Sequence, residues 1–396
     1  MFRTLTAFTM EADVKEDAVQ EILEQLDLEN QLLENAVGFF TCYLDHIKSG
    51  VIEAINEALP FEVIGCTVPM SGVSVSGEQA QLSLMVFTSD DTEFSVTLSE
   101  QFIDQSGEKF DSLIEDMWHK VCQNRKSEAE MLLVCQPFVL GFNWQGVTTS
   151  LAAYAGNIPI FGTLAIDIEL ELREPLVVFN GQSYADRMAI LAIGGSDLKP
   201  TFVVESFNME NNIAQDAIIT AVDGIRLLSI NDMPAVEYLT KIGMASDGKI
   251  NNAGNIAVPI AVDVHDGTKP RVGTFYSLDD EGAVICGQEL PVGASLTIGI
   301  VTNDAVLSSA KDALQQIALS AHEREEPHAI IVFSCFSRAI VINDMSDEYH
   351  MTRELLDPTG VPFMFSYSGG EICPLYNRNG EYVNISHVFS LVGVIF

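Results

Sequence analysis

The chain has 396 residues, and its 56 aspartates and glutamates outnumber its 20 lysines and arginines, which gives a formal net charge of −36 at pH 7. A field of that sign repels phosphate backbones and anionic lipids, so nucleic acids and membrane surfaces are unfavourable partners. Hydrophobic residues make up 47% of the chain, enough for a large core, yet no apolar run reaches the roughly eighteen residues needed to cross a bilayer.

The seven cysteines and the first residues of the chain indicate its compartment. No two cysteines are close enough for a CxxC motif, which argues against structural zinc, and several lie within apolar runs, as reduced core residues do. The first residues lack a charged segment followed by a long apolar one, so we expect no secretory signal. We therefore expect an acidic cytoplasmic protein without a bound metal.

The amino-terminal part of the chain predicts an alternation of strands and helices. Apolar side chains recur at helical spacing over residues 14–28, with Ile22 and Leu26 on one stripe. Asp45 is a suitable N-cap for a helix that ends at Leu59. In order we expect a strand over 1–11, the helix over 14–28, a buried strand over 36–40, the helix over 45–59, strands over 61–66 and within 71–98, and a helix over 108–122.

Three segments share one plan, namely residues 36–66, 131–163 and 329–366. Each has an apolar strand, a polar break, a helix and a second strand that is entered through a proline. Short apolar runs without alternation fit strands covered on both faces, so each segment predicts a parallel pair joined by a helix. Two explanations stay open: the segments are related α/β lobes, or strand–helix–strand units resemble one another for physical reasons alone.

Between the second and third of these segments the chain becomes rich in strands. The polar stretch 208–212 is the best candidate for a linker, and Pro234 suits the first turn of a short helix. Asp304 is expected to cap a helix that ends near Leu319. We expect strands over 176–179, 187–193 and 201–206, a hairpin over 217–230 that turns at Asp223-Gly224, strands over 258–264, 272–278, 283–288 and 295–301, and one closing strand over 382–396.

The strand ends of the third segment carry the strongest functional signal. The first strand runs into Cys335 and Arg338, and the second runs through Tyr367 to Gly370 and Glu371. Ligands of open parallel sheets collect beyond the carboxyl ends of the strands. These residues therefore predict the floor of a small-molecule pocket.

The residue types at these strand ends suit an amino acid as the ligand. Arg338 can hold a carboxylate through two parallel hydrogen bonds, and Glu371 can accept from an ammonium group. Gly370 lets the backbone approach a ligand closely. The alternative is that Arg338 and Glu371 pair with each other across the strand ends.

An ordered set of short motifs resembles the FIST family, and the set spans nearly the whole chain. The motifs are Val63-Ile64-Gly65-Cys66-Thr67, Ile160 to Asp167 with Phe179-Asn180-Gly181 after it, Ile230 to Ala235, Phe333 to Arg338 with its C-x-x-R pattern, Ser368 to Ile372 with Gly370-Glu371, and Asn384-Ile385-Ser386. The chain departs from the family pattern in having Ser366 where a glycine is expected.

The resemblance implies an α/β protein of two FIST-like halves, built from strand–helix–strand units with mixed sheets and β-rich connecting segments. The amino-terminal domain would span residues 1–210 and the carboxy-terminal domain residues 211–396. It also implies a cytosolic sensor, not an enzyme, that binds a small polar metabolite such as an amino acid. No output domain is recognisable, so a separate partner protein would carry the signal. The implied ligand-binding residues are Cys335, Arg338, Tyr367, Gly370, Glu371, Asn384, Cys66 and Thr67.

Two other functions stay open at this stage. Some family members bind haem and sense nitric oxide, which would need a histidine beside an apolar slot, with His46 and His119 as candidates; no other cofactor is expected. A thiol-dependent hydrolase would use Cys335 as its nucleophile and His350 or His387 as its base, although a packed thiol is the more common role for such a cysteine.

Overall fold

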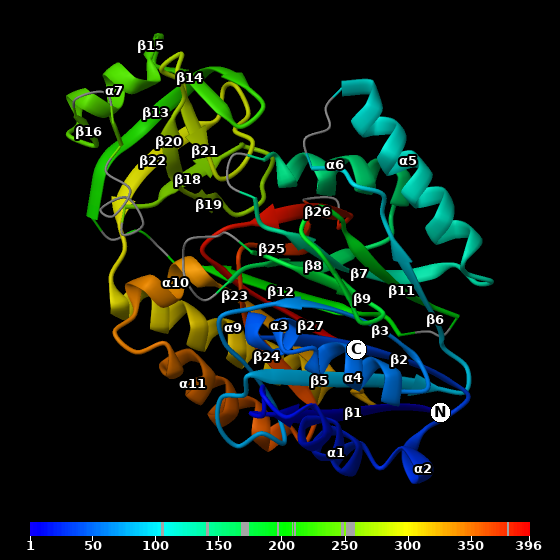
Figure 1. The fold of residues 1–396 in the computed structure, drawn as a ribbon. Coiled ribbons are helices and arrows are strands. Elements are labelled where there is room, and N and C mark those ends of the chain that lie inside the picture. Colours follow the sequence, from blue (N-terminus) through cyan, green and yellow to red (C-terminus); the bar gives the residue numbers. More distant parts are fainter. Residues whose placement is uncertain are drawn as a thin grey trace.

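The computed structural model describes residues 1–103, 107–139, 142–167, 174–195, 198–207, 209, 211–246, 249–250, 258–377 and 380–396. Its main body consists of three mixed β-sheets around a shared core, and a smaller β-domain lies at the upper left of Figure 1. The content of helices and mixed sheets confirms the predicted α/β class. No helix in this described part of the chain is both long and apolar enough to cross a membrane.

The first sheet comes mainly from the amino-terminal part of the chain. Its strands, in spatial order, are β1 (Phe2–Thr9), β5 (Leu82–Ser89), β2 (Asn35–Cys42), β3 (Glu62–Thr67), β9 (Val177–Phe179) and β10 (Gln182–Tyr184). Its helices are α1 (Lys15–Leu26), α2 (Leu28–Gln31), α3 (Leu44–Lys48) and α4 (Val51–Ala58). Side chains of α1 and α4 pack on its outer face.

The second sheet combines distant parts of the chain. Its strands, in spatial order, are β26 (Tyr382–His387), β25 (Glu371–Tyr376), β8 (Ile160–Ala165), β7 (Ala129–Pro137), β11 (Ala189–Gly194) and β6 (Glu93–Leu98). The helices α5 (Gly107–Gln123) and α6 (Trp144–Ala155) cover it at the upper right of Figure 1.

The third sheet is formed mainly by the carboxy-terminal part. Its strands, in spatial order, are β12 (Thr201–Ser206), β27 (Ser390–Ile395), β23 (Ile330–Cys335), β24 (Phe363–Ser368) and β4 (Ser71–Val73). Its helices are α9 (Asn303–Glu323), α10 (Phe336–Val341), α11 (Ser346–Leu356) and the short 3-10 helix η1 (Asp357–Thr359).

Each of the three sheets contains one parallel strand pair, and these pairs are the ones predicted from the three similar segments. They are β2 with β3, β7 with β8, and β23 with β24. In each pair the two strands are joined by one or more helices on the outer side of the sheet. The apolar runs of the sequence therefore predicted both the strands and their relative direction.

The carboxyl ends of these parallel pairs are tied together by a cycle of backbone hydrogen bonds. Each donor lies at the end of the second strand of one pair, and each acceptor lies in the segment after the second strand of the next pair. The bonds run from the amide of Thr67 to the carbonyl of Leu176, from Leu164 to Gly370 and from Tyr367 to Met70, at 2.9, 2.9 and 3.0 Å. This cyclic pattern supports related lobes and brings the three strand ends together.

Aromatic side chains from all three sheets meet in the central core. Phe161 of β8 stacks on Phe333 of β23 with ring centroids 5.2 Å apart, and Phe39 of β2 meets Phe333 edge-on at 6.1 Å. All three are fully buried, and burial of one such side chain stabilises the fold by roughly 1.5–3 kcal/mol. The core therefore fixes the three sheets against one another close to the shared strand ends.

The β-domain occupies the strand-rich region predicted between the second and third segments. Its sheet contains, in spatial order, β19 (Arg271–Gly273), β18 (Ile260–Asp263), β22 (Ser295–Ile300), β13 (Asn211–Asp223), β14 (Arg226–Ile230), β21 (Val284–Cys286) and β20 (Phe275–Leu278), with β15 (Met233–Pro234) beside β14. It also holds α7 (Ala235–Lys241) and a two-stranded sheet of β16 (Ala245–Ser246) and β17 (Lys249–Ile250). The hairpin that turns at Asp223 and the helix after Pro234 are as predicted.

Three sequence predictions about element ends were wrong. The helix expected over 45–59 with Asp45 as its N-cap begins at Leu44 after Tyr43, and it is divided into α3 and α4 because Gly50 adopts a left-handed conformation with φ of 78°. The N-cap of α9 is Thr302, whose hydroxyl accepts from the amide of Ala305, and not Asp304. The closing strand is two strands, because the chain turns at Phe389, which has φ of 60°.

The division into domains at residue 210 stays a prediction. The sheets themselves cross that position, since β4 pairs with β24, β12 with β27, and β25 with β8. Of the predicted linker 208–212, residues 208 and 210 lie outside the described residues, and residues 211 and 212 belong to β13.

Candidate functional site

The strand end at Cys335 leads directly into a short helix. β23 ends at Cys335, which lies opposite Ser368 of β24, and α10 begins at the next residue. Cys335 and Arg338 are both buried, with exposed fractions of 1% and 0%. The sharp change from strand to helix therefore directs an arginine into the protein interior and not toward solvent.

The guanidinium of Arg338 is bound by protein groups on all sides. Its Nε and Nη2 atoms donate to Oε1 of Glu348 at 2.9 and 2.8 Å, and the other carboxylate oxygen of Glu348 accepts from the Ser334 hydroxyl at 2.6 Å. Nη2 also donates to the carbonyl of Val306 at 3.0 Å, and Nη1 donates to that of Phe389 at 3.3 Å. Arg338 thus pairs with Glu348 and not with Glu371.

Glu371 lies at the start of β25 and is fully buried. It stands opposite Thr163 on one side and His387 on the other. By distance and angle, neither carboxyl oxygen forms a hydrogen bond with the described residues, but the Ser368 hydroxyl, the Cys335 thiol and the Ser390 backbone lie close enough to lower its pKa. Burial raises the pKa of Glu371 well above its ordinary value, and the positive charge of Arg338 opposes this only in part. Burial therefore shifts the equilibrium of Glu371 toward the neutral acid.

The groups around Glu371 come from two sheets of the main body and from the β-domain. The Thr163 hydroxyl donates to that of Ser368 at 2.9 Å. Burial, followed by the charge of Glu371, raises the pKa of the Cys335 thiol. Burial and the nearby Cys335 and Glu371 likewise raise the pKa of Tyr276, which is part of β20. Glu371 thus interacts electrostatically with the Cys335 thiol of the main body and with the Tyr276 phenol of the β-domain.

Tyr367 and Gly370 lie in the chain segment that leads to Glu371. The hydroxyl of Tyr367 donates to the carbonyl of Met345 at 3.0 Å, and its ring is fully buried. A Cβ atom on Gly370 would come within 3.3 Å of the Trp144 ring. Tyr367 therefore holds the start of α11, and Gly370 gives the backbone room to pass the aromatic ring.

The remaining predicted site residues have structural contacts, either hydrogen bonds to the backbone or packing in the core. The side-chain amide of Asn384 accepts from the amide of Ile160 at 2.8 Å and donates to the carbonyl of Ile158 at 3.0 Å. The hydroxyl of Thr67 accepts from the amide of Leu176 at 2.9 Å. Cys66 is fully buried in the central core. None of these three is among the groups around Glu371.

Sequence reasoning did not identify three groups that define this region, namely Ser334, Tyr276 and Glu348. Glu348 lies on α11, where Tyr349 and Thr352 are also fully buried. A carboxylate on the buried face of an amphipathic helix needs a partner. That pattern is the sequence signal that could have linked Glu348 to Arg338.

The histidines considered for haem or thiol chemistry lie apart from one another. His46 is fully buried, and neither ring nitrogen has a hydrogen-bond partner among the described residues, whereas the side chain of His119 is 62% exposed. His387 is buried and its Nε2 lies 2.8 Å from the carbonyl of Cys373. Across the described part of the chain, no three His, Cys, Asp or Glu side chains are arranged to hold a metal ion.

The fold and this buried polar cluster define a three-sheet α/β protein with an accessory β-domain. The FIST N domain model matches residues 36–233, and the FIST C domain model matches residues 235–374. The chain therefore belongs to the FIST family, as the motifs predicted. FIST domains are regarded as sensory domains that bind small ligands in signal transduction.

Comparison with other known proteins adds little. A cyanuric acid hydrolase from A. caulinodans is similar with a TM-score of 0.35 and 8% identity, over 100% of this chain and 98% of the hydrolase. PurL of T. maritima complexed with ATP has a TM-score of 0.20 and 13% identity, over 100% of this chain and 71% of PurL. No curated protein matches the sequence.

Proposed function

We propose that this protein is a sensor whose small polar ligand, such as an amino acid, presents a cationic nitrogen to Glu371. The observation that supports this best is a fully buried carboxyl group neither of whose oxygens forms a hydrogen bond of ordinary geometry with the described residues. A buried polar group without a partner destabilises a protein by about 1–3 kcal/mol. An ammonium group placed beside Glu371 would remove that cost and favour the charged carboxylate.

The position of Glu371 suits a sensing role. It lies where β25 of the main body approaches Tyr276 of the β-domain, and Tyr276 meets Phe138 edge-on at 6.1 Å. A ligand bound between these groups would push on Tyr276 and could thereby alter how the β-domain rests on the main body. Such a change in domain position is a common way to pass a signal to a partner protein.

The contacts of Arg338 limit the class of ligand. Its guanidinium is already bound to Glu348 and two backbone carbonyls, so a ligand carboxylate would have to displace a buried ion pair to reach it. The cationic end of the ligand therefore supplies the main recognition. A free carboxylate on the ligand would have to be held by backbone amides or hydroxyls other than that of Ser368, which already donates to the Gly370 carbonyl.

The contacts of Cys335 give no support to the hydrolase alternative. A nucleophilic cysteine needs a lowered pKa and a base within reach, whereas burial and Glu371 raise the pKa of Cys335. His387, one of the two candidate bases, is bonded to the Cys373 carbonyl. A sensing role agrees with the family and needs no reactive thiol.

Calorimetric titration and thermal shift measurements with the standard amino acids and with simple amines test this proposal. We expect at least one compound with a cationic nitrogen to raise Tm in a concentration-dependent manner, and Glu371→Gln to abolish the effect. Glu325→Gln, at an exposed position, is the matched control and should bind normally. No response to any compound, or an equal response in Glu371→Gln, would refute the proposal.

A haem reconstitution experiment separates this function from gas sensing. His46 has free ring nitrogens but is buried among side chains of the first sheet and its helices. Among the described residues, no histidine lines either of two larger cavities, of about 570 and 700 Å³. We therefore expect no Soret band after reconstitution, and a band that is lost in His46→Ala would favour the haem function instead.

A further inference from the structure

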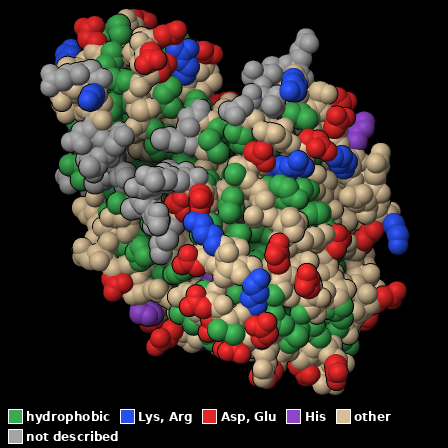
Figure 2. All heavy atoms as spheres, viewed as in Figure 1, with side chains coloured by type: hydrophobic (Ala, Val, Ile, Leu, Met, Phe, Trp, Pro, Cys, Tyr) green, Lys and Arg blue, Asp and Glu red, His purple; other side chains and the backbone are tan. Residues whose placement is uncertain are grey.

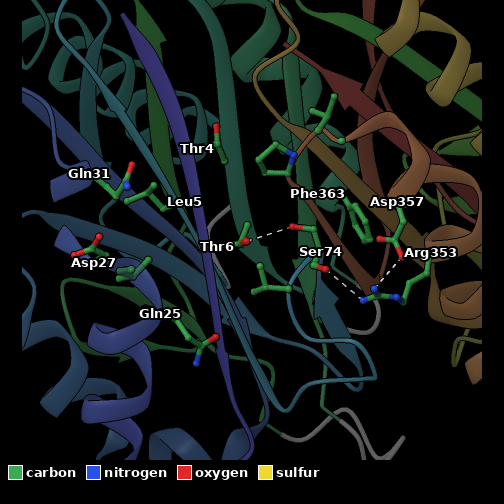
Figure 3. Close-up of a pocket in the computed structure, with 15 residues that line it drawn as sticks. Thr4, Leu5, Thr6, Gln25, Asp27, Gln31, Ser74, Arg353, Asp357 and Phe363 are labelled. Carbon is green, nitrogen blue, oxygen red and sulfur yellow. Dashed lines mark hydrogen bonds and ion pairs between the residues drawn. The ribbon is translucent and has the colours of Figure 1, made fainter.

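A groove of about 570 Å³ runs along the free edge of the first sheet (Figure 3). One wall is β1, from which Thr4 and Thr6 line the groove, together with Asp27 at the end of α1. The opposite wall carries Arg353 and Asp357. The groove therefore separates an edge strand of one sheet from the helix end that covers another.

The edge of β1 has main-chain groups that no neighbouring strand uses. β1 is the outermost strand and pairs only with β5. In an antiparallel pair alternate residues bond to the partner strand. The carbonyl of Met1 accepts from Asp90 beyond β5, so the odd-numbered residues bond to β5 and the even-numbered residues point away from it.

The end of this free edge at Phe8 shows how such groups are satisfied. The side-chain amide of Gln25 accepts from the Phe8 amide at 3.1 Å and donates to the Phe8 carbonyl at 2.8 Å. Gln25 thus takes the place of a peptide group on an additional strand. Nearer the start of β1, the backbone of Thr4 has no such substitute among the described residues and opens into the groove.

The charges of the groove favour a cationic occupant. Arg353 is the one cation among the described lining residues, and Asp357 neutralises it at 2.8 Å. Asp27 lines the same groove and forms no ion pair with another described residue, since its Oδ1 accepts from the neutral amide of Asn30. The side chain of Val75 at the rim is apolar and 54% exposed. Carboxylates are also spread over the face of the molecule in Figure 2.

We propose that an extended, lysine- or arginine-bearing segment of a separate protein binds in this groove and adds to β1 as a further strand. Its main chain would bond to Thr4, a basic side chain would reach Asp27, and an apolar one would cover Val75. Strand addition of this kind uses main-chain bonds for affinity and alternate side chains for specificity. An unprotected edge strand is suited to it. The proposal does not depend on a ligand at Glu371.

The test uses the full chain and a fluorescein-labelled heptapeptide of alternating lysine and valine. Fluorescence anisotropy should show saturable binding. Thr4→Pro removes the edge amide without removing a bond to β5, since proline is tolerated on the outer side of edge strands, and we expect binding about tenfold weaker or worse. Thr4→Val keeps the amide and is the matched control, which should bind as the wild type does.

Two further arms keep the result decisive. The same peptide with N-methyl groups on alternate residues cannot donate to the edge, so its loss of binding supports the proposal even if Thr4→Pro fails to fold. Asp27→Asn keeps the left-handed backbone that Asp27 adopts at φ of 45° and should weaken binding most at low salt. The proposal would be overturned if the wild type did not bind the peptide, or if Thr4→Pro or the methylated peptide bound equally well. It would also be overturned if peptide binding were lost at high protein concentration, because a second copy of this chain would then occupy the edge.

Discussion

The guanidinium of Arg338 donates from both Nε and Nη2 to a single oxygen, Oε1 of Glu348, and both side chains are fully buried. The second oxygen of Glu348 is occupied by Ser334. This ion pair joins α10 to α11, while the carbonyls of Val306 and Phe389 add α9 and the turn before β27. Arg338 therefore holds together α9, α10, α11 and the turn before β27, which all belong to the third sheet and its helices.

Removal of one partner of this pair should strongly destabilise the protein. Arg338→Met leaves the Glu348 carboxylate buried without its cation, which costs about 3–5 kcal/mol in the free energy of unfolding. Urea denaturation monitored by tryptophan fluorescence measures this loss. The double variant Arg338→Met with Glu348→Leu should regain a large part of it, since a buried pair can be replaced by apolar groups. A loss below about 1 kcal/mol for Arg338→Met would contradict the buried geometry.

The sequence predicted the three parallel pairs because their signal is local. Runs such as 330–333 and 363–365 are apolar at every position, which only a strand covered on both faces requires. The division of the helix at Gly50 could not be predicted so directly. Glycine in a helix interior costs only about 1 kcal/mol relative to alanine, so tertiary packing of α3 and α4 decides the outcome. The first residue of α9 was equally hard to predict, because Thr302 and Asp304 are both good N-cap residues.

For the candidate residues, the sequence predicted their positions along the strands but not their contacts. Cys335 ends β23, Arg338 lies in α10 directly after it, and Glu371 starts β25 shortly after the end of β24. The partner of Arg338 depends on how α11 packs across the sheet, which no short-range pattern records. Tyr276 belongs to the β-domain, and only the folded chain brings it near Glu371.

The stability of the protein should depend on the charge of Glu371. Its pKa is raised in the folded state, so the folded state binds the proton more tightly than the unfolded chain. The stability from this group is complete below the ordinary value of 4.5 and is lost as the pH rises through the raised pKa. Glu371→Gln should therefore be more stable than the wild type by roughly 1–3 kcal/mol at alkaline pH, and the difference should close in acid. Urea midpoints across the pH range measure it, and a constant difference would contradict the raised pKa.

Cysteine labelling should distinguish one residue from the other six. Cys122 is exposed, whereas the other six cysteines of the described structure are buried. Iodoacetamide should therefore modify Cys122 alone in the native protein at neutral pH, and all seven in denaturant. Mass spectrometry of proteolytic fragments locates the label, and Cys122→Ser is the control that should abolish native labelling. Rapid native modification of Cys335 would show that its thiol is accessible and reactive, contrary to its burial.

In acid, the free energy of unfolding should depend on the protonation of His387. Burial, opposed by the bond to the Cys373 carbonyl and aided to a smaller extent by the positive charge of Arg271, lowers its pKa from 6.5 to about 4. The unfolded chain therefore binds more protons than the folded one between these values, so stability falls as the pH decreases through this window. The loss is on the order of 3 kcal/mol.

His387→Gln keeps a donor for the Cys373 carbonyl but cannot titrate, so its stability should fall less steeply over the same window. Glu371 on β25 stands opposite His387 on β26. The measurement should therefore be repeated in the Glu371→Gln background, where the difference between the two slopes of stability against pH should persist. His119→Gln, at an exposed position on α5, is the matched control and should leave the profile unchanged. Equal slopes for the wild type and His387→Gln would mean that His387 is not buried in its neutral form, and that the strand pair β25 and β26 is open to solvent at this point.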